Sequence, residues 1–280
     1  MVMEKSRMPC FTARQQVGFA LPCDPTGGGI IVSFENKVCV ITGAAQGIGE
    51  VYSKAAADRG AAVVVADIDV ENGQRVANEI INDGGHAIFA KTDVSSPESC
   101  EAMAAAAKDA FGGIDYLINN AAIYGDMEML PLLEVPIDYY NRFMSVNMNG
   151  CLFVTRAVYP SMAERGGGAI VNQSSTAAWS CSGFYGIAKL GVHGITINLA
   201  RELGPRNIRV NAVVPGPIDT EATRKVIPSE MVQGILRAMP LSRMGKPEDL
   251  VGTCLFLLSD EASWVTGQTW AVDGGMAMRP

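Results

Sequence analysis

Tyr185 and Lys189 are the two residues of this sequence whose types and spacing most directly suggest proton transfer. They lie four residues apart in a stretch with helical spacing, so both side chains leave the same face of one helix. A tyrosine in water has a pKa of about 10 and is a poor base at neutral pH. A neighbouring ammonium stabilises the phenolate and lowers that pKa, which makes proton exchange with an alcohol or carbonyl oxygen feasible.

Ser174, Ser175 and Asn147 could assist such a proton transfer. The two serines end a predicted strand, at the carboxyl edge where ligands collect in doubly wound sheets, and a hydroxyl there can hydrogen-bond the same substrate oxygen. Two serines after a strand are otherwise a common turn. Asn147 falls inside a predicted helix, where asparagine is unfavourable and has no cap to serve. It either kinks the helix and holds a water, or faces solvent.

A glycine-rich turn, residues 42–49, lies between the first predicted strand and the first predicted helix. Its glycines, Gly43, Gly47 and Gly49, let the backbone approach a pyrophosphate, whose charge the helix N-terminus and its free N–H groups stabilise. The spacing differs from the general G-x-G-x-x-G pattern, so a simple tight turn is the alternative. Its place directly after an apolar strand favours the phosphate site.

Asp67 ends the second predicted strand, about 20 residues beyond the glycine turn. An acidic side chain there can accept hydrogen bonds from the adenosine ribose of a dinucleotide. A 2'-phosphate would meet this carboxylate at close range, and Ala45 and Gln46 stand in the turn where a basic residue could have neutralised it. The sequence therefore predicts NAD rather than NADP, and capping of the following turn is the alternative role for Asp67.

The elements that must position these residues alternate along the chain from Lys37 onward. Short β-branched runs alternate with stretches of helical spacing, an order typical of βαβ units in a parallel sheet that is covered on both faces. We therefore predict an α/β protein with a three-layer, doubly wound Rossmann fold and a seven-stranded, mostly parallel sheet. Strands are expected at residues 38–42, 62–66, 86–91, 116–118, 169–173, 209–213 and 269–272, and helices at 48–59, 70–82, 97–111, 137–164, 184–203 and 247–259. Residues 220–245, rich in proline and methionine, interrupt this alternation and are expected to form a mobile lid.

Composition narrows the class of protein. A chain of 280 residues that is 48% hydrophobic can bury a large core, and one domain over residues 34–280 is the default. The formal net charge of -7 offers no basic face to nucleic acid. Seven scattered cysteines without a C-x-x-C pair, together with only two histidines, predict reduced thiols and no metal site.

Residues 1–33 precede the predicted domain. Their apolar stretch, residues 17–21, ends at Pro22 and is too short for a signal peptide or a membrane anchor. No other uninterrupted apolar run reaches spanning length, so we expect a soluble, cytoplasmic protein without a membrane partner. We expect residues 1–33 to form a flexible N-terminal extension. A disordered arm, an arm used in oligomerisation and an over-long predicted start are all compatible with the sequence.

In combination, these motifs resemble the short-chain dehydrogenase/reductase superfamily in its single-domain, NAD-using form. The matching motifs occur in the family's order: residues 42–49, residues 119–122, Asn147, Ser175, the Tyr185-x-x-x-Lys189 pair and residues 215–216. The resemblance implies a catalytic tetrad. In it, Tyr185 would transfer the proton and Ser175 would polarise the substrate oxygen. Lys189 would bind the nicotinamide ribose and lower the pKa of Tyr185, and Asn147 would hold a proton-relay water.

The resemblance also implies an NAD site. Asp93 and Val94 match the family's adenine contact, residues 119–122 match the strand end beneath the cofactor, and residues 215–220 match the segment that holds the nicotinamide carboxamide. The residues expected to bind NAD are Gly43, Gln46, Gly47, Ile48, Gly49, Asp67, Asp93, Val94, Asn120, Ala121, Tyr185, Lys189, Pro215, Gly216, Ile218 and Thr220.

Two departures from the family pattern bear on the site. Ala122 stands where the fourth-strand motif usually has glycine, and the loop between Ser175 and Tyr185 is a few residues shorter than is usual. Because that loop normally borders the substrate, Ser174 stays open as the functional hydroxyl. Cys181 lies in the same loop and is either redox-sensitive or, as the preferred interpretation, a small buried filler.

We expect an oxidoreductase that moves a hydride between NAD(H) and a small, apolar secondary alcohol or ketone. The segments expected to line its substrate pocket, residues 122–129, 179–184 and 220–244, are mainly apolar and include Tyr124, Trp179, Met231 and Met239. One alternative is a 3-oxoacyl-thioester reductase acting on an acyl carrier or coenzyme A, against which Asp67 and the net charge weigh. A non-catalytic nucleotide-binding sensor is the other, against which Tyr185 and Lys189 weigh. The resemblance further suggests a homotetramer.

Overall fold

The computed structural model describes residues 32–279, which contain a seven-stranded sheet. Its strands follow the β-branched runs of the sequence and lie in the order β3-β2-β1-β4-β5-β6-β7. Every pairing is parallel, so the prediction of a doubly wound α/β fold is confirmed. The strands are β1 (Val38–Thr42), β2 (Ala62–Asp67), β3 (His86–Lys91), β4 (Tyr116–Asn119), β5 (Gly168–Gln173), β6 (Ile208–Pro215) and β7 (Thr269–Val272).

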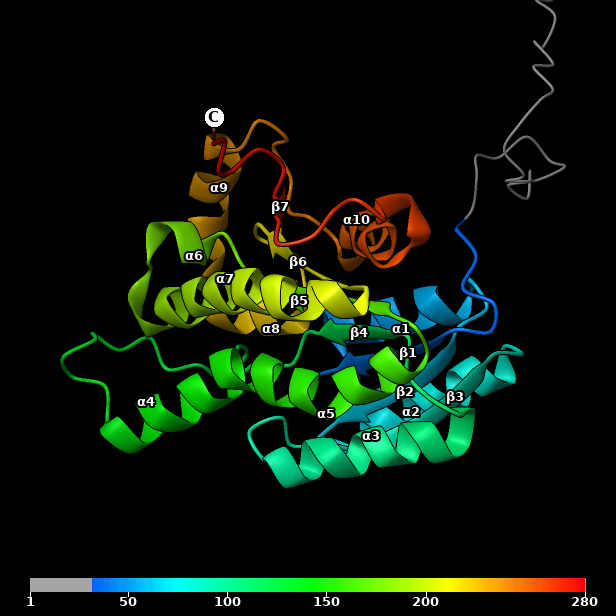
Figure 1. The fold of residues 1–280 in the computed structure, drawn as a ribbon. Coiled ribbons are helices and arrows are strands. Elements are labelled where there is room, and N and C mark those ends of the chain that lie inside the picture. Colours follow the sequence, from blue (N-terminus) through cyan, green and yellow to red (C-terminus); the bar gives the residue numbers. More distant parts are fainter. Residues whose placement is uncertain (1–31, 280) are drawn as a thin grey trace, which may run out of the picture. The chain divides into compact units, whose positions relative to one another are not determined.

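Two layers of helices cover the sheet. One face packs against α1 (Gly47–Ala57), α2 (Val70–Asn82) and α10 (Pro247–Leu258), through a cluster of buried side chains that includes Tyr52, Val76 and Leu250. The other face packs against α3 (Pro97–Phe111), α5 (Gly150–Glu164) and α7 (Gly183–Leu203), through a cluster that includes Met103, Val158 and Leu199. Figure 1 shows α3 and α5 below the sheet and α10 above it. This is the three-layer arrangement predicted from the sequence.

The strand order reverses between β1 and β4, which are neighbours in the sheet although they are distant in the chain. At such a reversal the helices that follow the two strands leave toward opposite faces, and a crevice opens outside the carboxyl ends of the strands. Thr42 ties the two strand ends together, because its Oγ1 accepts hydrogen bonds from the backbone N–H groups of Asn120 (3.0 Å) and Ala121 (3.1 Å). The crevice therefore has a rigid floor.

The expected helix over residues 137–164 is divided in two. Helix α4 (Ile137–Met144) passes into a π-helical turn, η1 (Ser145–Asn149), before α5 begins at Gly150. A π-turn inside a helix widens it by one residue and is often found at functional sites. Asn147 lies in this turn, and it bonds outside the helix, as described below, which is a physical reason for the local change.

The expected lid, residues 220–245, contains two helices that the sequence pattern did not predict, α8 (Glu221–Val226) and α9 (Ser229–Ala238). Thr220 begins α8, because its Oγ1 accepts a hydrogen bond from the backbone N–H of Thr223 (3.1 Å). Three further short elements lie outside this segment: α6 (Ala177–Ser180), η2 (Gly204–Arg206) and η3 (Asp260–Ala262).

The N-terminal extension expected at residues 1–33 lies, up to residue 31, outside the described residues. Phe34 is fully buried, with its ring centroid 5.0 Å from that of Tyr116 on β4. Within residues 32–279 there is no helix whose length and apolar character would let it cross a membrane. The same residues bring together no group of three histidines, cysteines or carboxylates that could hold a metal ion.

Candidate active site

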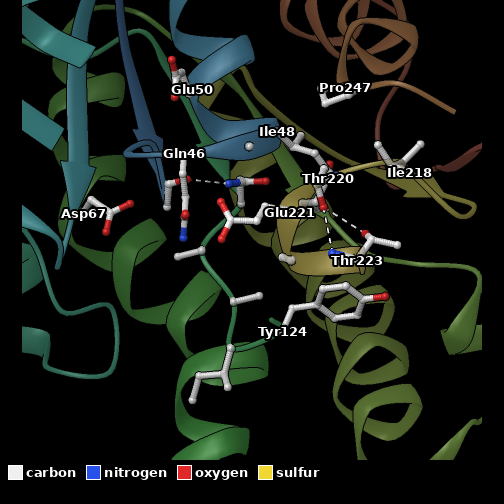
Figure 2. A pocket seen from close by; sticks show the side chains of 18 of the residues that line it. Gln46, Ile48, Glu50, Asp67, Tyr124, Ile218, Thr220, Glu221, Thr223 and Pro247 are labelled. Carbon is white, nitrogen blue, oxygen red and sulfur yellow. Dashed lines mark hydrogen bonds between the residues drawn. The ribbon is translucent and has the colours of Figure 1, made fainter. Parts of the chain in front are cut away.

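A cavity of about 880 Å³ occupies the crevice at the carboxyl edge of the sheet. The segments after β1 to β6 all contribute to its walls. Figure 2 shows Asp67 on one side of it and Tyr124 with Thr223 on the other, with Gln46 and Ile48 of the glycine turn between them. Every residue predicted to bind NAD lines this cavity, with one exception, Gly49.

Gly49 lies behind the cavity wall, where a Cβ atom would collide with the carbonyl oxygen of Gly43. Gly43 and Gly47 adopt left-handed backbone conformations, with φ of +62° and +58°, which side chains rarely tolerate. Helix α1 begins at Gly47, and the side chain of its N-cap residue, Gln46, makes no capping hydrogen bond. The first N–H groups of α1 are therefore available to an anion, and the turn fits a pyrophosphate.

Asp67 caps the following turn, which is the alternative role weighed for it from the sequence, and it also lines the cavity. Its Oδ1 accepts a hydrogen bond from the N–H of Asp69 (2.9 Å), which caps the following turn, and its Oδ2 accepts one from the N–H of Ala45 (2.9 Å) in the glycine turn. The carboxylate also lines the cavity. Two backbone donors thus hold it in place, and carboxylate oxygens retain lone pairs for ribose hydroxyls.

Arg75 lines the same end of the cavity, but its charge is already paired. Its guanidinium donates to Glu50 (2.8 Å), Glu79 (3.0 Å) and the carbonyl oxygen of Ala45 (3.2 Å). These bonds raise the pKa of Arg75, the one to Glu50 most strongly. A 2'-phosphate would therefore meet the carboxylate of Asp67 without a free guanidinium to offset it.

Lys189 is buried beneath the opposite end of the cavity. Its Nζ donates a hydrogen bond to the carbonyl oxygen of Gln173 at the end of β5 (2.9 Å) and lies 5.9 Å from the ring centroid of Tyr185. Burial lowers the pKa of Lys189 to about 8, because the ammonium loses its hydration. At neutral pH the side chain remains mostly protonated.

Tyr185 is partly buried, and its burial raises the pKa of the phenol above the ordinary value. A hydrogen bond with the Ser175 side chain lowers that pKa, but by less. The net direction is opposite to the expectation that Lys189 lowers the pKa of Tyr185. The physical reason is that removing a phenolate from water raises the pKa more than the interaction with Ser175 lowers it.

The two serines have different surroundings. Ser175 Oγ accepts a hydrogen bond from the N–H of Ala177 (3.2 Å), and the Ser175 side chain lowers the pKa of the neighbouring Tyr185 phenol. Ser174 is buried, and its Oγ donates to the carbonyl oxygen of Lys189 (3.1 Å) and lies 2.8 Å from His193 Nε2. Ser175 thus has the hydroxyl beside the phenol, while the hydroxyl of Ser174 is occupied within the protein.

Asn147 is buried, so the alternative that it faces solvent is wrong. Its Oδ1 accepts from the N–H of Ile123 (2.8 Å) and its Nδ2 donates to the carbonyl oxygen of Ile123 (2.9 Å), which ties the π-turn to the segment after β4. Asn147 and Lys189 also line a second cavity of about 10 Å³. That volume is close to the smallest that holds one water.

Aromatic and apolar groups form the wall beside Tyr185. The ring of Tyr124 lies 5.4 Å from that of Tyr185, and the Thr223 side chain on α8 partly offsets the rise in the pKa of Tyr124 that burial causes. Ala222, also on α8, packs against Gly125, where an added Cβ would come within 3.1 Å of it. Helix α8 therefore lines this end of the cavity, and the mobility expected of residues 220–245 stays a prediction.

Three of the residues expected to line the substrate pocket lie elsewhere. Trp179 packs against His193 and beneath the guanidinium of Arg279, Met231 is exposed on α9, and Met239 is buried against Gly274. Cys181 is exposed at the end of α6, so the preferred interpretation of a buried filler is wrong. It ends the helix in a left-handed conformation, with φ of +49°.

Comparison with known proteins assigns the family. A family model described as Enoyl-(Acyl carrier protein) reductase matches residues 43–277. An uncharacterized oxidoreductase of Mycobacterium tuberculosis (strain H37Rv) is 62% identical over 246 residues, which cover 88% of this chain and 99% of that protein. The solved structure of a 7α-hydroxysteroid dehydrogenase complexed with NADH and 7-oxo glycochenodeoxycholic acid is 35% identical, with a TM-score of 0.82, and the match covers 87% of this chain and 95% of that one. The chain belongs to the short-chain dehydrogenase/reductase superfamily.

This short-chain dehydrogenase/reductase is therefore an oxidoreductase, as predicted from its motifs. It is also 38% identical over 245 residues to the cyclohexanol dehydrogenase of Acinetobacter sp. (strain SE19), which covers 86% of this chain and 95% of that protein. These relatives include dehydrogenases named for a cyclic alcohol and for a hydroxysteroid.

Two residues near the site of this short-chain dehydrogenase/reductase were missed by sequence reasoning. Gln173 provides the carbonyl oxygen that holds Lys189, a backbone role that leaves no signal in the sequence. His193 contacts Ser174 from α7. It follows Lys189 by four residues, the same spacing that singled out Tyr185 and Lys189, and this was the available signal.

Proposed function

We propose that this oxidoreductase transfers a hydride between NAD(H) and a small, apolar secondary alcohol or ketone, with Tyr185 as general acid and base. The observation that carries the proposal is that one cavity joins the glycine turn and Asp67 at one end to Ser175, Tyr185 and Lys189 at the other. NAD(H) supplies the hydride acceptor or donor when it is bound. The NADH in the related hydroxysteroid dehydrogenase structure supports this choice of cofactor.

Different parts of the cavity wall would bind different parts of NAD(H). Gly43, Gly47 and the N-terminus of α1 would hold the pyrophosphate, and Asp67 would accept hydrogen bonds from the adenosine ribose. Further residues of the cavity wall are proposed to bind the adenine and the nicotinamide, namely Gln46, Ile48, Asp93, Val94, Asn120, Ala121, Lys189, Pro215, Gly216, Ile218 and Thr220. Thr220 already caps α8, so its hydroxyl would link the nicotinamide to the lid.

Proton transfer follows from the surroundings of Tyr185. Its raised pKa keeps the phenol protonated in the free protein, ready to donate to a carbonyl oxygen during reduction. For oxidation, the ammonium of Lys189 favours the phenolate that must accept the proton of the alcohol. Ser175 would hydrogen-bond the same oxygen and hold it beside Tyr185. The second cavity, beside Lys189 and Asn147, supports a water-mediated path for the proton.

The substrate class is proposed from the wall next to Tyr185. Ile123, Tyr124 and Ala222 give this wall an apolar and aromatic surface. Such a surface suits the ring of a cyclic secondary alcohol better than a sugar or a charged group. The names of the cyclohexanol and hydroxysteroid dehydrogenases, two relatives of this chain, support the same class.

A substrate panel tests the proposal directly. The purified protein is mixed with NAD⁺ or NADP⁺ and with cyclohexanol, a hydroxysteroid or a linear secondary alcohol, and NADH or NADPH is followed by absorbance. We expect turnover with NAD⁺ and cyclic secondary alcohols. Reduction of a 3-oxoacyl thioester with NADPH, at a higher kcat/KM than any alcohol gives with NAD⁺, would favour the second candidate, a thioester reductase. The observation in its favour is a relative from Thermotoga maritima that is named a 3-oxoacyl-[acyl-carrier-protein] reductase and is 38% identical over 252 residues.

Asp67→Asn is expected to weaken the preference for NAD. The change removes the charge that repels a 2'-phosphate and weakens two ribose hydrogen bonds, so kcat/KM with NAD⁺ should fall by roughly 10- to 100-fold while that with NADP⁺ rises. The matched control is Asp69→Asn, which alters the N-cap of α2 but leaves Asp67 in place. Equal ratios of kcat/KM with NAD⁺ to kcat/KM with NADP⁺ in the two variants would contradict the role of Asp67.

The expected homotetramer and cytoplasmic location stay predictions.

A further inference from the structure

A hydrogen-bonded triangle joins the end of β5 to helix α7 just below the proposed catalytic groups. The N–H of Ser174 donates to the carbonyl oxygen of Val213 on β6 (2.8 Å), which fixes the Ser174 backbone in the sheet. Its Oγ donates to the carbonyl oxygen of Lys189 (3.1 Å) and lies 2.8 Å from His193 Nε2. A hydroxyl has only one proton to give. If the Lys189 carbonyl receives it, His193 must donate from Nε2, so its neutral form carries the proton there.

His193 is enclosed from every side. It is 7% exposed and lies one helical turn beyond Lys189 on α7. Trp179 of α6 covers it at a ring-centroid distance of 6.0 Å, and the guanidinium of Arg279, from the C-terminal segment, lies 4.9 Å from the ring of Trp179. The charged groups that face His193 are Lys189, on its own helix, and Arg279, and both are cations. Within residues 32–279, no carboxylate forms a hydrogen bond or an ion pair with this imidazole.

This environment keeps His193 neutral. Burial lowers the pKa of the imidazole most, and Arg279 and Lys189 lower it further. A neutral imidazole with a proton on Nε2 is the state that the triangle needs. His193 is thus a hydrogen-bond donor to Ser174. It does not line the large cavity, so it is not placed to exchange a proton with a substrate there.

We propose that His193 is a positioning residue that acts through Ser174. By holding the Ser174 hydroxyl on the Lys189 carbonyl, it fixes the distance between Ser175, the next residue of the strand end, and the turn of α7 that carries Tyr185 and Lys189. The bond from Lys189 Nζ to the Gln173 carbonyl is a second link between the same two segments (2.9 Å). Without His193, Ser174 can rotate away, and the strand end loses this hydrogen bond to the turn of α7 while the bond from Lys189 to Gln173 stays. This proposal rests on the proposed function of Ser175, Tyr185 and Lys189.

The test compares two replacements of His193 by their effect on kcat. His193→Leu removes the donor, and we expect kcat for the alcohol to fall by about tenfold while KM for NAD⁺ changes little. The reason is that misalignment of Ser175 and Tyr185 slows the chemical step but leaves the contacts with the cofactor unchanged. His193→Gln keeps an N–H near the position of Nε2 and should restore kcat to within about twofold of the wild type. Ser174→Ala should resemble His193→Leu, and the double variant should lose no more than either single variant.

Thr196→Val is the matched structural control. Thr196 is as deeply buried on the same helix, but its hydroxyl bonds with Asn172 (2.9 Å) and the Val192 carbonyl (2.7 Å) and has no contact with Ser174. This variant should lose thermal stability with kcat unchanged. The proposal is overturned if His193→Leu also keeps the wild-type kcat, or if the effects of Ser174→Ala and His193→Leu add. If the wild type shows no NAD-linked turnover, the proposed function fails and the positioning role fails with it.

The pH dependence of stability gives a second readout. Because the pKa of His193 is lowered in the folded protein, the unfolded chain binds a proton first as the pH falls below about 6.5. The wild type should therefore lose stability between pH 6.5 and more acidic values faster than His193→Gln does. Melting temperatures of both proteins across this range check it, and identical slopes would contradict the burial of a neutral imidazole.

Discussion

Replacing Tyr185 by phenylalanine is expected to reduce kcat for alcohol oxidation by about three orders of magnitude, the range that general acid and base catalysis supplies. The ring packs 5.4 Å from Tyr124 and 6.4 Å from Phe143, contacts that phenylalanine keeps. The fold and the affinity for NADH should therefore be retained, as NADH fluorescence and thermal melting would show. Only the hydroxyl beside Ser175 is lost.

Tyr124→Phe is the matched control for this prediction. It removes the same hydroxyl from the neighbouring ring in the same cavity, and the interaction it loses is the one with Thr223 on α8 that affects the pKa of Tyr124. We expect a change in KM for the alcohol and only a several-fold change in kcat, because a lost neutral hydrogen bond is worth about 1 kcal/mol. If Tyr124→Phe lowers kcat more than Tyr185→Phe does, Tyr185 is not the acid and base.

Replacing Lys189 by methionine is expected to abolish turnover and, at the same time, to stabilise the fold. Burial lowers the pKa of Lys189 from 10.5 to about 8, so keeping it charged inside the protein at pH 7 costs about 3 kcal/mol. Methionine has a similar length and no charge, but it leaves the Gln173 carbonyl without its donor. We therefore expect a net gain of about 2 kcal/mol in the free energy of unfolding at pH 7.

The sign of the pH dependence makes the Lys189 prediction specific. Between pH 8 and 10.5 the unfolded chain holds the proton of Lys189 while the folded protein has released it, so the wild type gains stability as the pH rises. The advantage of Lys189→Met should therefore shrink over that range in denaturant titrations. Lys108→Met, at an exposed lysine paired with Glu164 (2.7 Å), should change stability by less than about 1 kcal/mol. A loss of stability in Lys189→Met at pH 7 would contradict the buried charge.

Much of the fold follows from local patterns. The β-branched runs predicted each strand to within two residues at either end, because strands buried on both faces need continuous apolar sequence. The helices of residues 221–238 were not predicted, because only the tertiary fold decides that α8 packs against Gly125. The π-turn at Asn147 also escaped prediction, since it depends on Ile123, a residue 24 positions away.

The sequence by itself determined the order of the layers, the glycine turn, Asp67 and the pairing of Tyr185 with Lys189, because backbone conformation and the spacing along one helix are local properties. Only the tertiary structure decided the state of those groups. The pKa of Tyr185 is raised rather than lowered. Ser175 rather than Ser174 has its hydroxyl beside the phenol, and His193 forms a hydrogen bond with Ser174. Each of these depends on burial and on partners from other strands and helices. Contacts between distant parts of the chain produce no regular pattern in the sequence, so they could not be predicted from it.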